Sequence, residues 1–146
     1  MVSWLRHFHL RSNYRALFTD CEGHVPKTIL VVEDHDDIRA TIKMILEVMG
    51  CRVMEATDGA AAVELARRER PHLILMNLNL PVLDGFQATK QIREQGETLQ
   101  IPVVAMSAHC WDFDWHEKAK RVGCQDCLKK PVDFDALDKL LIKIYC

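Results

Sequence analysis

Short apolar runs without polar alternation recur along the chain, and stretches with helical spacing separate them. The clearest run is Leu73–Met76, which ends at Asn77 before Pro81 and Asp84-Gly85 turn the chain. An uninterrupted apolar run of this length is typical of a strand buried on both faces, as in the middle of a parallel sheet. Asn77 therefore ends a central strand, the position at which ligands and chemistry collect in open α/β sheets.

The same signals predict four further strands. They are Thr28–Val32, Cys51–Ala56, Ile101–Met106 and a short strand near Asp126–Leu128. The strand at Cys51–Ala56 is the least apolar of these runs, which favours a place nearer a sheet edge.

Five segments show helical spacing or helix boundaries. They are a helix from Asp36 or Asp37 with a core face of Ile38, Ile42, Ile45 and Met49; one after Asp58-Gly59 containing Val63, Leu65 and Ala66; one around Phe86, Thr89 and Ile92; one from about Trp111 to Val122; and a last one with Phe134, Leu137, Leu140, Leu141 and Ile144 on one face. The alternation predicts an α/β domain, a doubly wound five-stranded parallel sheet with five helices.

Length and composition fit this prediction. The 146 residues suffice for one domain with a core, and 49% hydrophobic and 27% charged residues are ordinary for a soluble protein. The formal net charge of -2 gives no electrostatic argument for nucleic acid or a membrane surface. No apolar run approaches the ~20 residues that a membrane span needs. We expect a cytoplasmic protein with neither a nucleic-acid nor a membrane partner.

Residues 1–26 differ from the predicted domain, which covers residues 27–146. The segment mixes Arg6, Arg11 and Arg15 with Trp4 and Phe8, and charge interrupts its apolar stretch, unlike a secretory signal. It could form an amphipathic helix that docks on a partner or on the domain, or it could be a flexible extension or an over-called start. The expectation is a flexible amino-terminal extension.

The cysteines do not suggest a disulfide framework. All six (Cys21, Cys51, Cys110, Cys124, Cys127 and Cys146) are scattered through a domain large enough to need no covalent links. Reduced thiols in a cytosolic protein are the expectation. Cys124 and Cys127 have the spacing of a redox or zinc motif, but no second Cys or His pair at zinc spacing accompanies them, and buried thiols are the simpler interpretation.

Polar side chains end the predicted strands. They are Glu33, Asp34, Asn77, Ser107 and Lys130. Because these strand ends converge on one rim of the sheet, two carboxylates, an amide, a hydroxyl and an ammonium should share a pocket. Mg²⁺ takes oxygen ligands from one or two carboxylates, and Ser107 and Lys130 can donate to phosphoryl oxygens. This donor set suits a divalent cation and a phosphoryl group.

The set resembles the receiver domain of two-component response regulators. The matching pieces are VVEDH, LILMNLNLPVLDG, VVAMSA and CLKKP, and the similarity covers about residues 27–145. Several separated motifs in the right order make the resemblance specific. It implies the flavodoxin-like receiver fold, Mg²⁺ as cofactor and a sensor histidine kinase or another signalling protein as partner.

The resemblance also implies roles for individual residues. Glu33 and Asp34 match the family's Mg²⁺-binding acids, and Asn79 would offer its backbone carbonyl to the metal. Ser107 matches the hydroxyl residue that follows the phosphoryl group and switches the output face. Lys130 matches the family's lysine, and Lys130-Pro131 matches a peptide bond that is cis in the family.

Two positions depart from the family pattern. Asn77 stands where the family has its phosphoaccepting aspartate, and Cys127 stands where an aromatic residue usually moves with activation. An amide oxygen is a weak nucleophile, and asparagine cannot form an acyl phosphate. The exchange also removes a negative charge, which matters by about 4 kcal/mol at ~4 Å and an effective dielectric of ~20. We therefore expect weakened Mg²⁺ binding and no phosphorylation at Asn77.

An aromatic group marks the predicted fourth helix. Trp111, Phe113 and Trp115 alternate there, and alternate positions on a helix cannot all face inward. Exposed aromatic side chains would suit a partner interface. In the family, the output face lies at the fourth helix, the fifth strand and the fifth helix, so Ser107, Cys127, Trp111 and Trp115 are its candidate residues here. Homodimerisation through the fourth and fifth helices is a further possibility.

Three hypotheses follow. Since the sequence ends at Cys146, the first is a stand-alone receiver-like module, not an enzyme, that acts through protein–protein contacts without phosphorylation. The second is a conventional phosphoaccepting receiver in which Asn77 is an engineered replacement for aspartate. The third and weakest is a redox or small-ligand module on the same scaffold.

Overall fold

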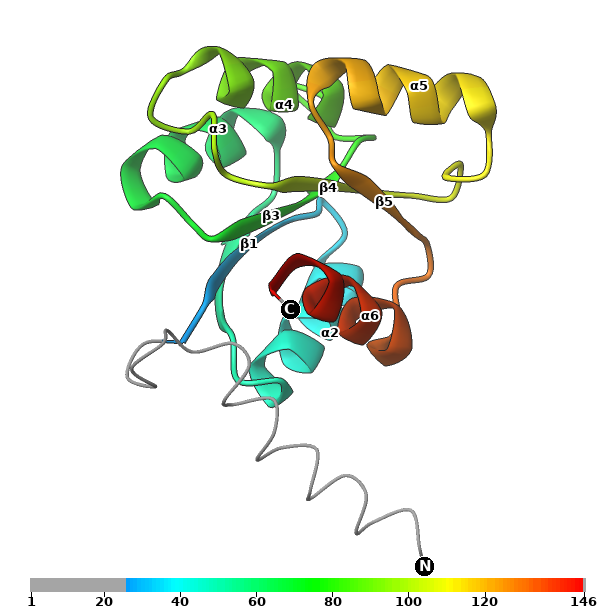
Figure 1. Cartoon of the computed structure of the whole chain (residues 1–146). Coiled ribbons are helices and arrows are strands. Elements are labelled where there is room, and N and C mark those ends of the chain that lie inside the picture. Colours follow the sequence, from blue (N-terminus) through cyan, green and yellow to red (C-terminus); the bar gives the residue numbers. More distant parts are fainter. Residues whose placement is uncertain (1–25, 146) are drawn as a thin grey trace, which may run out of the picture.

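The computed structural model describes residues 26–145, in which five strands alternate with five helices (Figure 1). In chain order these are β1 (Thr28–Val32), α2 (Asp36–Val48), β2 (Arg52–Ala56), α3 (Gly59–Glu69), β3 (Leu73–Asn77), α4 (Gly85–Glu94), β4 (Val103–Ser107), α5 (Phe113–Val122), β5 (Asp126–Lys129) and α6 (Phe134–Tyr145). The predicted α/β alternation is confirmed. Of the predicted segment 1–26, only Pro26 lies within the described residues.

The five strands form one parallel sheet in the order β2-β1-β3-β4-β5. The prediction that β2 lies at an edge is confirmed, and β3 is the central strand. In the register, Val32 pairs with Met76, Asn77 with Met106 and Ser107 with Lys129. The carboxyl ends of β1, β3, β4 and β5 therefore meet at one rim of the sheet.

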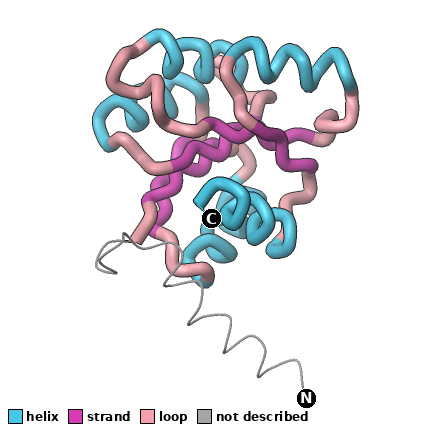
Figure 2. Tube along the Cα trace, in the orientation of Figure 1, coloured by secondary structure: helices cyan, strands magenta, loops and turns pink. Residues whose placement is uncertain are grey.

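Helices cover both faces of the sheet, α2 and α6 on one and α3, α4 and α5 on the other (Figures 1 and 2). Alternation along the strands divides the core accordingly. Ile29 and Val31 of β1 join the α2/α6 side, whereas Leu30 and Val32 join the other. Because both faces are covered, the central strands read as continuous apolar runs.

Two helices differ from their predicted form. In α2 the prediction of an inward-facing Ile38 is wrong, because this side chain is 37% exposed. The buried face of the helix begins one turn later and consists of Ile42, Leu46 and Met49. The fourth helix begins at Phe113, since the Asp112 carboxylate caps it by accepting from the Trp115 N–H at 3.0 Å. Trp111 therefore lies in the β4–α5 loop. No helix among residues 26–145 is long and apolar enough to span a membrane.

Gly85 illustrates how closely α4 packs behind the rim. It is the first residue of α4, and its N–H donates to the Leu78 carbonyl at 3.1 Å. A Cβ at this position would lie 2.6 Å from the Cα of Leu78 and would overlap the carbonyl oxygen of Asn77. Only a residue without a side chain allows this approach.

We predict that Gly85→Ala lowers the free energy of unfolding by about 2 kcal/mol, because the added methyl must push backbone apart. Urea unfolding followed by circular dichroism measures the change. Gly96→Ala is the matched control, since a Cβ there meets nothing within 4 Å. Equal stability of the two variants would contradict the close packing of α4 on the end of β3.

Candidate functional site

Asn77, at the end of β3, holds the two acidic side chains of the rim. Its amide Nδ2 donates to Glu33 Oε1 at 3.1 Å and to Asp34 Oδ1 at 3.2 Å. Its Oδ1 accepts the backbone N–H of Asn79 at 3.1 Å. Both polar ends of the side chain therefore have partners, and Asn77 is only 4% exposed. The donor edge of the amide faces the acids.

Lys130 supplies the positive charge at the rim. Its Nζ lies 2.8 Å from Glu33 Oε2, and the Glu33 side chain is fully buried while that of Lys130 is 22% exposed. The Lys130 backbone N–H donates to the Ser107 carbonyl at 2.9 Å, and the Lys130-Pro131 peptide bond is cis. This hydrogen bond continues the β4–β5 pairing and aims the Lys130 side chain back toward β1.

His35 joins this group, which sequence reasoning did not anticipate. Its Nδ1 lies 3.2 Å from Glu33 Oε1 and 3.3 Å from Asp34 Oδ1, although the side chain is largely exposed. The usable signal is adjacency, since His35 directly follows both acids at a strand end.

The rim has the atoms for a hard cation but also competes with one. One ligand atom from each of Glu33, Asp34 and His35 lies within 4.8 Å of the others. Glu33 and Asp34 are the residues that would hold Mg²⁺, which prefers carboxylate oxygens. The same carboxylate oxygens already accept hydrogen bonds from Asn77 and face Lys130. A cation bound by Glu33 would therefore compete with Asn77 and Lys130 for the carboxylate oxygens.

Ser107 ends β4 at the same rim. It is 7% exposed, and its Oγ accepts the backbone N–H of His109 at 2.9 Å. The hydroxyl therefore anchors the first turn of the β4–α5 loop, residues 108–112.

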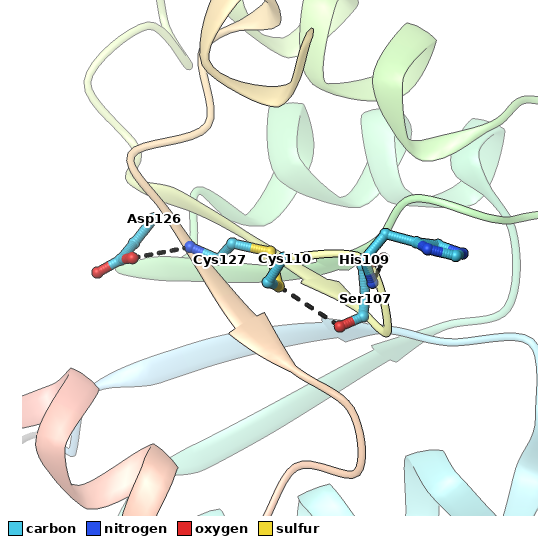
Figure 3. The surroundings of a disulfide bond; sticks show 5 residues. All are labelled: Ser107, His109, Cys110, Asp126 and Cys127. Carbon is cyan, nitrogen blue, oxygen red and sulfur yellow. Dashed lines mark hydrogen bonds between the residues drawn. A yellow bond between two sulfur atoms is a disulfide. The ribbon is translucent and has the colours of Figure 1, made fainter. Parts of the chain in front are cut away.

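The expectation of reduced thiols is wrong for Cys110 and Cys127, which form a disulfide (Figure 3). Ala105 of β4 pairs with Cys127 of β5, and the β4–α5 loop turns back so that Cys110 reaches the same place. Cys124 does not pair with Cys127, because it is buried beside Thr89 at an Sγ–Oγ1 distance of 4.0 Å. The pairing depends on sheet register and loop path, which the spacing of cysteines does not reveal.

The aromatic group divides as the helical spacing requires. Trp111 and Phe113 are 74% and 75% exposed. Trp115 instead packs edge-on against Phe86 of α4, with ring centroids 5.3 Å apart. Two large apolar side chains thus stand in solvent at the start of α5.

The comparisons with known proteins agree with this fold. The family model described as "Response regulator receiver domain" matches residues 29–142 of this chain. Protein PilH of Pseudomonas aeruginosa is 38% identical over 115 residues, which cover 77% of this chain and 93% of PilH. The chain belongs to the response regulator receiver family.

Two solved structures place the rim in context. The receiver domain of sensor histidine kinase PA1611 from Pseudomonas aeruginosa PAO1 has a TM-score of 0.74 and 37% identity, over 80% of this chain and 95% of that one, and it has a magnesium ion in its active site cleft. The receiver domain of Ssk1 was solved in complex with the Saccharomyces cerevisiae phosphotransfer protein Ypd1. It has a TM-score of 0.73 and 31% identity, and the match covers 82% of this chain and 89% of that chain. The predicted receiver fold is confirmed.

We predict that Lys130→Met lowers the free energy of unfolding by about 3 kcal/mol, because it leaves a buried Glu33 carboxylate without its cation. Lys129→Met is the matched control, since Lys129 is exposed, and it should cost less than about 0.5 kcal/mol. Denaturant unfolding measures both.

A double-mutant cycle isolates the contact. Combining Lys130→Met with Glu33→Gln should recover at least about 1 kcal/mol relative to the sum of the single changes. Additive effects, or equal effects of Lys130→Met and Lys129→Met, would show that this ion pair does not stabilise the rim.

Proposed function

We propose that this receiver acts in two-component signal transduction through protein–protein contacts, without accepting a phosphoryl group at Asn77. The observation that carries the proposal is the orientation of the Asn77 amide, whose N–H groups bind the carboxylates of Glu33 and Asp34. The side chain at the end of β3 thus acts as a hydrogen-bond donor to the acids.

The chemistry of the amide supports the proposal. Phosphoryl transfer to this position requires an oxygen nucleophile that can hold a mixed anhydride. The Asn77 Oδ1 carries no full negative charge and already accepts the Asn79 N–H. In an aspartate, a carboxylate would face Glu33 and Asp34 and repel both, and a divalent cation would relieve that repulsion. The amide removes the repulsion and also the carboxylate nucleophile, and without that nucleophile this chain does not autophosphorylate at Asn77.

Magnesium binding is weakened for the same reason. The two acids that would hold the ion have partners in Asn77 and Lys130. An aspartate at position 77 would add a negative charge that attracts a divalent cation, and the neutral Asn77 amide does not supply it. PilH and the PA1611 receiver support the assignment of the rim to this family, and the departure at Asn77 supports the difference in affinity.

The partner is a sensor histidine kinase, a phosphotransfer protein or another signalling protein in the cytoplasm. The complex of Ssk1 with Ypd1 supports a protein partner for this fold. On this chain, Trp111 and Phe113 are the exposed aromatic side chains that such a contact would bury at the start of α5. A second copy of the chain docking through α5 and α6 is the alternative occupant of that surface.

We predict that the chain gains no phosphoryl group when incubated with acetyl phosphate and Mg²⁺, whereas Asn77→Asp gains one. The variant restores a carboxylate beside Glu33 and Asp34, and Mg²⁺ relieves the repulsion among the three acids. Intact mass spectrometry measures the gain.

Asn79→Asp is the matched control, because it places a carboxylate two residues away on an exposed side chain. It should gain nothing. Phosphorylation of the unmodified chain would contradict the proposal and point to another acceptor. If Asn77→Asp also stays unmodified, more than one residue of the rim differs from a phosphoaccepting site. The absence of phosphorylation would then not be due to Asn77 alone, and variants of Lys130 would test the contribution of that residue.

A further inference from the structure

The Cys110–Cys127 disulfide joins the β4–α5 loop to β5 (Figure 3). The two cysteines are 17 residues apart in sequence, and the whole of α5 lies between them. Their Cα atoms are 5.8 Å apart, within the usual range for a disulfide. The β4–β5 register places Cys127 beside Ala105, and the turn of the β4–α5 loop brings Cys110 to the same place, so the bond can open through movement of the loop without moving the strands.

The other described cysteines differ from this pair in burial. Cys51 and Cys124 are buried, and burial raises the pKa of the Cys51 thiol to about 12 and that of Cys124 to about 11. A thiol must lose its proton to attack a disulfide, so these two are unreactive near neutral pH. Cys110 and Cys127 are only partly buried. Among the cysteines of residues 26–145, reagents in solution therefore reach this pair selectively.

We propose that Cys110 and Cys127 form a reversible thiol–disulfide site that takes small-molecule disulfides and thiols as its reactants. In oxidation, one thiolate attacks a small disulfide, forms a mixed disulfide and releases a small thiolate. The second cysteine thiolate then attacks the protein sulfur of that mixed disulfide and releases a second small thiolate. The protein loses two protons and two electrons, and the small disulfide becomes two thiols. Reduction by small thiols reverses both steps.

The state of this site controls the order of the β4–α5 loop. In the oxidised form two adjacent loop residues are held, Cys110 by the disulfide and His109 by the hydrogen bond from its N–H to Ser107 Oγ. Trp111 directly follows Cys110 and is 74% exposed, so the bond also fixes where this aromatic side chain stands. After reduction, the Cys110 sulfur keeps only a weak contact, 3.4 Å from the Ser107 carbonyl oxygen.

This inference does not depend on the proposed function. Asn77, Glu33 and Asp34 take no part in it, and the pair would respond to thiols whether or not Asn77→Asp accepts a phosphoryl group. In a reducing compartment, a disulfide of this kind is typically transient or redox-sensing rather than structural.

The first experiment maps the bond in the full chain after equilibration with oxidised glutathione, and again with reduced glutathione. Free thiols are alkylated in acid-quenched samples, which are then digested with trypsin and a protease that cleaves before aspartate. Cleavage before Asp126 separates Cys124 from Cys127, so residues 122–125 and 126–129 give different fragments. We expect Cys110 linked to fragment 126–129 in oxidised glutathione, and both thiols alkylated after reduction.

The second experiment measures hydrogen exchange of residues 108–112. Reduction of the unmodified chain should speed exchange at least about tenfold and lower Tm by roughly 10 °C, because the closed loop is released. Cys110→Ser should match the reduced chain and no longer respond to glutathione. Cys124→Ala is the control and should keep the full response.

Several results would overturn the inference. They are alkylation of Cys110 and Cys127 in oxidised glutathione, a link from Cys127 to Cys124 instead, a bond that reduced glutathione leaves intact in the folded chain, or identical exchange of residues 108–112 in the two states. Chemical reduction of the unmodified chain keeps the test valid even if Cys110→Ser folds poorly.

Discussion

The buried Glu33 carboxylate is the constraint on which the rest of the rim depends. A charge removed from water is costly unless it is paired and hydrogen-bonded. Here Lys130 Nζ takes one oxygen at 2.8 Å and Asn77 Nδ2 the other at 3.1 Å. Glu33 follows β1, Asn77 ends β3 and Lys130 follows β5, so satisfying one carboxylate holds three strand ends in a fixed relation.

The same constraint sets what the rim can do. In this family the pocket gathers negative charge, and Asn77 instead brings N–H donors to Glu33 and Asp34. In the function we propose, this pocket binds a cation less strongly and has no carboxylate nucleophile at the end of β3. The same proposal makes signalling depend on the surface, where Trp111 and Phe113 are exposed, and on the state of the loop that carries Trp111.

The fold could be predicted from the sequence because the central strands are uninterrupted apolar runs, and such runs indicate burial on both faces. Leu73–Met76 is uninterrupted because helices cover both faces of β3, and polar residues mark where it stops. The strand-end acids and Lys130 followed from topology alone. The Cys110–Cys127 bond did not, because it depends on the path of a loop. Nor did the contacts of His35 or the direction of the Asn77 amide, which are set by side-chain geometry.

The most direct test of the account is an NMR titration of the Asn77 side-chain amide with Mg²⁺. We expect its two N–H resonances to be shifted downfield and slow to exchange, as hydrogen bonds to two carboxylates require, and to stay in place as Mg²⁺ rises to millimolar concentration. Saturable shifts of the Asn77 and Asn79 resonances at micromolar Mg²⁺ would show that a cation readily displaces these bonds. The pocket would then retain the cation affinity that the account denies it.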